Sequence, residues 1–170
     1  AEAQDRMRSA PPGKADASGA AHGGVLSAYQ DAEDHTIRPA EGAVVEQPRD
    51  TLRDEEQTNV VFGEGLVRCM GCGVDLAVAA ALPESALAGN AFRNSYAYDA
   101  ASGRLLVHRL RLGSPGDVAL VLAHAVSHIK ANRNDLSNDL DPAFIKEFHA
   151  NLKLITQELA KRRSVPAMPR

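Results

Sequence analysis

Residues 114–132, "SPGDVALVLAHAVSHIKAN", decide the fold because they combine a strong helix start with an apolar run. The serine suits the position that caps a helix, the proline suits its first turn, and the aspartate follows within that turn. We therefore predict a helix over residues 115–132, central and buried because it is apolar nearly all round. At about 100° per residue, His124 and His128 share one side of it. Buried imidazoles need hydrogen-bond partners or a metal ion.

Two neighbouring segments have clear patterns of their own. The "DPAF" that starts at Asp141 repeats the helix-start device, which predicts a second helix over residues 142–162. A stripe at spacings of three and four predicts its core-facing side, formed by Ile145, Phe148, Leu152, Ile155 and Leu159. The alternating residues 95–112, "SYAYDAASGRLLVHRLRL", predict a β-hairpin that turns at "DAASG".

The remaining apolar segments complete the expected fold. Residues 59–69, "NVVFGEGLVRC", are interpreted as a strand or short hairpin around Gly63 and Gly65. Residues 73–90 are compatible with a strand or a helix, with a break at the proline inside them. The fold class that follows is α+β: a small antiparallel sheet packed against two or more helices, preceded by a long irregular arm.

The arm is expected from composition. Residues 1–58 hold 12 acidic and 6 basic side chains, whereas residues 59–170 hold 10 acidic and 13 basic ones and most of the large aliphatic residues. Low hydrophobicity with unbalanced charge buries too little surface to offset chain entropy. We therefore predict a disordered or partner-bound acidic arm over residues 1–58 and an α+β domain over residues 59–170.

Charge, apolar runs and cysteine content exclude several classes. No run approaches the 18 or so apolar residues of a membrane span, and no secretory signal pattern is present. A pI of about 6.1 and 4% aromatic residues argue against a dedicated nucleic-acid binder. The two cysteines form one Cys-x-x-Cys pair and no disulfide framework. We expect an intracellular, reducing compartment: the cytoplasm or cytoskeleton, cilia included.

Residues 121–132, "VLAHAVSHIKAN", resemble the active-site helix of the zincin metallopeptidases, whose motif is His-Glu-x-x-His. The resemblance implies that His124 and His128 are zinc ligands. Ala125 stands where the family has the glutamate that activates water, so the family's hydrolytic step lacks its base. Losing a general base costs roughly 10²–10⁴-fold in rate.

Residues 66–76, "LVRCMGCGVDL", resemble a zinc knuckle, a strand that runs into Cys-x-x-Cys-Gly. Tetrahedral zinc needs two ligands beyond Cys69 and Cys72, and the chain has no further cysteine. We therefore predict a structural zinc held by Cys69, Cys72, His124 and His128. The alternatives are four ordinary buried side chains, a redox-active cysteine pair, or a remnant metal site with other ligands.

Other titratable side chains receive simpler interpretations. His108 is expected to point inward, as a core residue or a substitute ligand, and His149 to lie on the surface. Asp135, Asp139 and Asp141 cluster without the spacing of a calcium loop, so turn and cap chemistry accounts for them.

Three function classes follow. The favoured class is a non-catalytic structural or interaction subunit of a larger intracellular assembly, contacting protein partners through residues 1–58, with no role for membrane or nucleic acid. The second is a zincin-related metal-dependent hydrolase or its inactive remnant. The third is a thiol oxidoreductase that uses Cys69 and Cys72.

Overall fold

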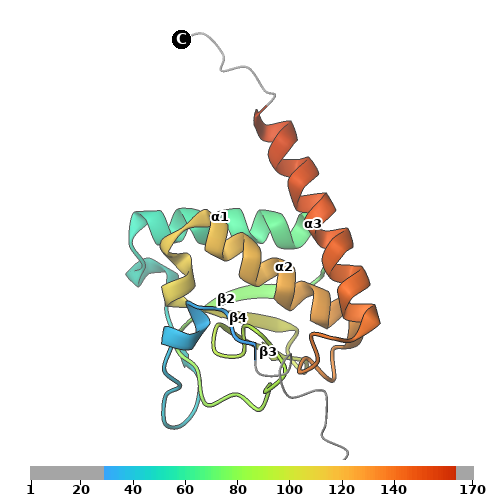
Figure 1. Ribbon diagram of the computed structural model, residues 1–170. Helices are drawn as coiled ribbons and strands as arrows, with labels where there is room; N and C mark the ends of the chain where they lie inside the picture. Colours follow the sequence, from blue (N-terminus) through green and yellow to red (C-terminus); the bar gives the residue numbers. More distant parts are fainter. Residues whose placement is uncertain (1–28, 164–170) are drawn as a thin grey trace, which may run out of the picture.

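The computed structural model describes residues 29–163 and has the α+β architecture that the sequence predicts (Figure 1). None of the helices in this part of the chain combines the length and apolar character needed to cross a bilayer. The elements follow one another as η1 Asp34–Thr36, β1 Val45–Glu46, η2 Arg49–Thr51, α1 Asp54–Cys69, β2 Asp75–Ala81, β3 Tyr96–Asp99, β4 Arg104–His108, η3 Arg109–Gly113, α2 Pro115–Asn132 and α3 Pro142–Arg163.

The sheet has the order β1-β2-β4-β3 and is mixed, whereas the sequence predicted an antiparallel one. β3 and β4 form the expected antiparallel hairpin, and β1 pairs antiparallel with β2. β2 and β4 run parallel, with Leu76 beside Leu105 and Val78 beside Val107. β3 lies at the edge beyond β4, and the β3–β4 hairpin brings the chain back so that β4 lies parallel to β2.

The core lies between one face of the sheet and the helices. Figure 1 shows α1 and α2 crossing above the sheet, with α3 rising beside α2. Leu76, Val78, Leu105 and Val107 point from the sheet into this core, and Val121, which is fully buried, meets them from α2. α2 is enclosed by the sheet, α1 and α3, which explains why its sequence is apolar nearly all round.

The strand predicted over residues 59–69 is wrong, because these residues belong to the helix α1. The buried positions follow helical spacing, in the set Val60, Gly63, Leu66, Val67 and Met70. Gly63, which suggested a turn, is a contact point between helices. A Cβ at Gly63 would lie 2.9 Å from Cδ1 of Leu122, so glycine lets α1 approach α2 closely.

The helices predicted over residues 115–132 and 142–162 are confirmed. The side chain of Ser114 accepts a hydrogen bond from the Asp117 N–H at 3.1 Å, as a capping residue does. The predicted stripe on α3 is only partly right. The buried face consists of Phe144, Phe148, Asn151 and Ile155, while Ile145, Leu152 and Leu159 are 37–39% exposed.

Residues 29–58, assigned from composition to the arm, lie against the domain. Asp34 is fully buried, Ile37 is 4% exposed, and β1 forms the edge of the sheet next to β2. The N–H of Asp31 donates to the Ala91 carbonyl at 2.9 Å. Residues 1–28, the rest of the predicted arm, lie outside the described residues.

Candidate metal centre

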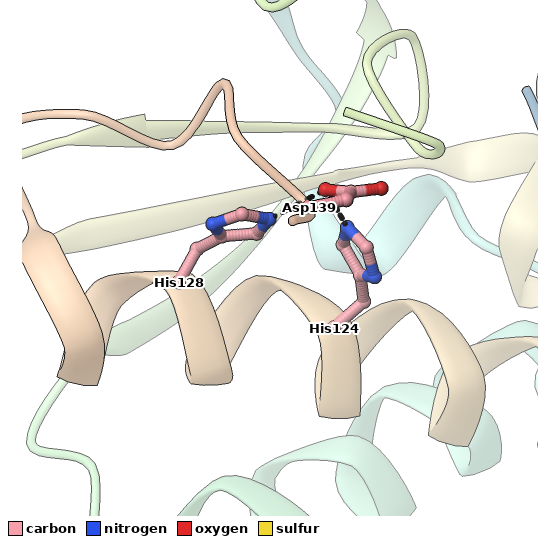
Figure 2. Close-up of side chains that lie close together, drawn as sticks. All are labelled: His124, His128 and Asp139. Atoms are coloured by element: carbon pink, nitrogen blue, oxygen red, sulfur yellow. Dashed lines mark hydrogen bonds and ion pairs between the residues drawn. The ribbon is translucent and has the colours of Figure 1, made fainter. Parts of the chain in front are cut away.

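α2 carries two histidines toward one carboxylate (Figure 2). His124 and His128 lie one helical turn apart and are 4% and 2% exposed. Nε2 of His128 forms a hydrogen bond with Oδ1 of Asp139 at 2.8 Å. Nε2 of His124 lies 3.1 Å from the same oxygen, within ion-pair distance. This contact lacks hydrogen-bond geometry, so Nε2 of His124 is the buried side-chain polar atom without a well-directed hydrogen bond among the described residues.

Asp139 comes from the loop between α2 and α3, which short polar turns hold in shape. The Asp135 carboxylate accepts from the Ser137 N–H at 3.0 Å, and the Asn138 side chain accepts from the Leu140 N–H at 3.0 Å. Such Asx turns fix the backbone without any regular element. Oδ2 of Asp139 is occupied by a hydrogen bond from the Ala91 N–H at 2.8 Å. Only Oδ1 therefore faces the histidines.

Aromatic rings enclose the cluster. The Phe144 ring stacks on His128 with centroids 3.9 Å apart and an interplanar angle of 15°. Phe92 lies 4.7 Å and Phe144 4.9 Å from the His124 ring, centroid to centroid. The two imidazoles are thus buried between apolar rings, while the Asp139 side chain is 21% exposed.

At Asp139 and at His124, burial and neighbouring charge shift the pKa in opposite directions. Desolvation favours the neutral form of Asp139, but its close polar contacts with His124 and His128 and their charge outweigh desolvation and hold the pKa of this carboxyl well below its usual range. Desolvation lowers the pKa of His124, and the attraction of Asp139 offsets only part of that effect. Asp139 is thus an anion at neutral pH, and burial favours the neutral His124 imidazole that could bind a cation.

The donor set fits a transition-metal ion. The three ligand atoms lie within 4.8 Å of one another. Two atoms bound to one tetrahedral zinc are about 3.3 Å apart, so the observed separations of 2.8 and 3.1 Å from Oδ1 need to widen by only a few tenths of an ångström. A bound ion would also give Nε2 of His124 a directed bond in place of its poorly oriented contact with Oδ1.

The structure does not bring Cys69 and Cys72 into this group, whose members are His124, His128 and Asp139 among the described residues. Cys69 ends α1, and its Sγ lies 3.7 Å from the Leu154 carbonyl oxygen on α3. Cys72 is half-buried in the following loop, and burial raises the pKa of its thiol. The sequence therefore predicted two of the three clustered residues and joined them to a cysteine pair that lies elsewhere.

Asp139 is the residue that sequence reasoning missed. Turn and cap chemistry does describe its neighbours, since Asp141 accepts from the Ala143 N–H at 2.8 Å at the start of α3. The available signal was the position of Asp139 shortly after the histidine helix, in a loop that must reverse direction. His108 is buried as expected, with Nδ1 accepting from the Leu110 N–H at 3.2 Å, and His149 is exposed.

Comparisons with family models, with curated proteins and with solved structures find no match to this chain. The function is therefore argued from the cluster itself.

Proposed function

We propose that this chain is a non-catalytic structural or interaction module stabilised by a zinc ion bound to His124, His128 and Asp139. The observation that carries the proposal is the unsatisfied Nε2 of buried His124, which lies 3.1 Å from a carboxylate oxygen already bonded to His128. Buried polar atoms without a well-directed hydrogen bond are rare in folded proteins, and each one calls for an explanation. Zinc bound at this point supplies that explanation.

Zinc is supported by the ligand types. Two imidazoles and one carboxylate form a set that zinc accepts. Three protein ligands leave a fourth position open, which is usual in catalytic zinc sites, so the non-catalytic assignment rests on the missing general base and not on the ligand count. Calcium and magnesium prefer oxygen ligands only. Structural zinc in small peptides contributes about 10–16 kcal/mol of apparent binding free energy, comparable to the 5–15 kcal/mol that stabilises a whole domain. A zinc ion here would fasten the loop between α2 and α3 to the central helix.

A hydrolase is less well supported. Ala125 occupies the position of the zincin glutamate, and it is fully buried and has no proton-accepting group. Water activation there would lack a general base, a loss of roughly 10²–10⁴-fold.

A thiol oxidoreductase is supported still less. Reactive cysteines have a lowered thiol pKa, often at a helix N-terminus. Cys69 lies at the C-terminal end of α1 and not at a helix N-terminus, and burial raises the pKa of Cys72. The interaction part of the proposal rests on the composition of the N-terminal residues, and their binding to protein partners stays a prediction.

The test is metal content by elemental analysis on the full chain. We expect about one zinc per chain in the wild type, retained in Cys69→Ser/Cys72→Ser and lost in Asp139→Asn. A strong chelator should lower the melting temperature of the wild type and of the cysteine variant, but not that of Asp139→Asn.

Other results would support a different assignment. Zinc that disappears with the cysteines would support the four-ligand site predicted from sequence. A wild type without zinc, even after loading, would overturn the metal proposal. Metal-dependent peptide hydrolysis that is lost in Asp139→Asn would move the assignment to a hydrolase.

A further inference from the structure

Residues 89–91 form several hydrogen bonds with the loop that carries Asp139. The Asp139 N–H donates to the Gly89 carbonyl at 3.3 Å, and the Ala91 N–H donates to Oδ2 of Asp139 at 2.8 Å. The backbone and the carboxylate of the same residue are therefore both held by one short segment. We call residues 89–91 the frame.

Asn90 is the centre of the frame. It is fully buried, and its Nδ2 donates to the Leu136 carbonyl and to the Tyr96 hydroxyl, each at 2.7 Å. Its Oδ1 accepts from the Phe92 N–H at 2.8 Å. One side chain thus joins the loop before Asp139 to β3 and to the aromatic wall over His124. Because both amide donors and the acceptor are used, the orientation of Asn90 is fixed.

The absence of a side chain at Gly89 allows this close approach. A Cβ at Gly89 would lie 2.3 Å from the Ser137 carbonyl oxygen, a distance that no side chain tolerates. The two backbones touch only because this position has no side chain. Any larger residue would push the loop between α2 and α3 outward, and Asp139 with it.

We infer that the frame determines which metal ion the cluster accepts, an inference that rests on the proposed zinc site. With Oδ2 bound to the Ala91 N–H, Asp139 offers a single oxygen. The Phe144 ring stacked on His128, and the Phe92 and Phe144 rings inclined to His124, limit the room for water ligands. Calcium needs six to eight oxygen ligands, often with bidentate carboxylates, and magnesium keeps several waters. The frame therefore selects a four-coordinate ion that accepts nitrogen ligands, and zinc is the ion of this class with closed-shell tetrahedral preference.

The frame residues are not ligands, so their role is positioning. Partners that orient metal ligands typically change metal affinity about 10–100-fold when they are removed. Asn90→Ala is the direct variant and Gly89→Ala a second one that keeps the Asn90 side chain. Asn59→Ala is the matched control, because Asn59 is 6% exposed and donates one hydrogen bond to the Leu112 carbonyl at 2.9 Å, away from the cluster.

The experiment measures zinc affinity on the full chain by competition with a chromophoric chelator, and the visible spectrum of the chain loaded with cobalt(II). We expect Asn90→Ala and Gly89→Ala to bind zinc about 10–100-fold more weakly than the wild type, while Asn59→Ala stays within about 3-fold. The intense bands of four-coordinate cobalt should weaken in both frame variants and persist in the control. Excess calcium or magnesium should not displace zinc from the wild type.

Each outcome has a separate meaning. A wild type that binds no zinc overturns the proposed function. A wild type that binds zinc, with both frame variants matching Asn59→Ala in affinity and spectrum, overturns only the role of the frame. If Asn90→Ala does not fold, Gly89→Ala decides the question, because it displaces the loop while keeping the Asn90 side chain.

Discussion

Arg111 shows how one buried charge orders the first described residues. It is 1% exposed, and its guanidinium lies 2.5 Å from Oδ1 of Asp31 and 2.8 Å from Oε2 of Glu33. Nε donates to the Ser95 hydroxyl at 2.8 Å, and the group sits 5.3 Å above the Phe92 ring. Its two carboxylate partners differ in exposure, because the Asp31 side chain is 19% exposed and that of Glu33 59%.

We predict that this difference in exposure decides how much each carboxylate contributes to the free energy of unfolding. Asp31→Ala should lower the free energy of unfolding by about 3 kcal/mol, because it removes the better-buried partner of a buried charge. Glu33→Ala should cost less than about 1 kcal/mol, as for exposed ion pairs. Urea unfolding of the two variants measures both values. Equal losses of unfolding free energy would show that the exposure of the two carboxylates does not determine how much each one stabilises the fold.

Glu56 gives a prediction about pH. Hydrogen bonds from Arg109 and Arg53 lower the pKa of this buried carboxyl to about 2, from an ordinary value near 4.5. The folded chain thus keeps the proton off while the unfolded chain binds it. The stabilisation is present above about pH 4.5 and is lost as the pH falls toward about 2. The difference in unfolding free energy between wild type and Glu56→Gln should therefore be larger at pH 7 than at pH 3. A difference that grows on acidification would contradict the assigned ion pairs.

The histidine pair could be predicted from sequence, and Asp139 could not. His124 and His128 are four residues apart on one helix, so local geometry alone places them together. Asp139 reaches them only because the loop folds back over α2, and contacts with Gly89 and Ala91 set that path. Those partners are about 50 residues away in sequence, beyond what local patterns report. The predicted four-ligand zinc site failed for the same reason, because no local pattern fixes the distance between the cysteine pair and the histidine pair.

α3 shows why a periodic pattern can choose the wrong face of a helix. The apolar stripe read from sequence omits Asn151, which is fully buried and donates to the Ser127 hydroxyl at 2.9 Å. A buried asparagine counts as polar in any hydrophobic pattern, so the apparent stripe rotates away from it. The true face includes Phe144 and Ile155.

This face assignment predicts unequal effects along α3. Ile155, 6% exposed, contacts the core, whereas Leu152 is 37% exposed. Ile155→Ala should cost about 2–4 kcal/mol through lost burial and a cavity, and Leu152→Ala should cost about 1 kcal/mol or less. Thermal unfolding of the two variants compares them. A greater loss of stability from Leu152→Ala would indicate that the buried face of α3 is the one predicted from the sequence.

The two glycines of α1 allow a matched comparison. In a free helix interior, alanine is preferred to glycine by about 1 kcal/mol. At Gly63 a Cβ would meet Cδ1 of Leu122 at 2.9 Å, so we expect Gly63→Ala to destabilise by about 1–3 kcal/mol through overpacking. At Gly65 the nearest atom is Nη2 of Arg162 at 3.4 Å, the movable end of a side chain. Gly65→Ala should be neutral or stabilising. Stabilisation by both variants would mean that α1 and α2 are not tightly packed.

At the scale of the whole molecule, average composition did not locate the start of the folded unit. Acidic residues made residues 1–58 look unable to fold, yet Asp34 is fully buried and accepts from the Ser95 hydroxyl at 2.5 Å. Composition counts charges without their partners, and here Arg111 pairs with Glu33 and Asp31, which lie 78 and 80 residues earlier in the chain. The fold class could be predicted because it depends on the local patterns of α2, α3 and the hairpin.

The boundary of the domain can be tested by comparing chains that begin at residue 29 and at residue 59. Starting at residue 59 removes β1, the first turn of α1 and both carboxylate partners of Arg111, which leaves a buried guanidinium with only the Ser95 hydroxyl. Removing the partners of a buried charge costs about 3–5 kcal/mol, a large part of the 5–15 kcal/mol that holds a domain together. We therefore expect the shorter chain to melt at a much lower temperature, or without a cooperative transition, in calorimetry or circular dichroism. Equal melting temperatures would mean that residues 29–58 add nothing to the core, and that the arm extends to residue 58 as its composition indicates.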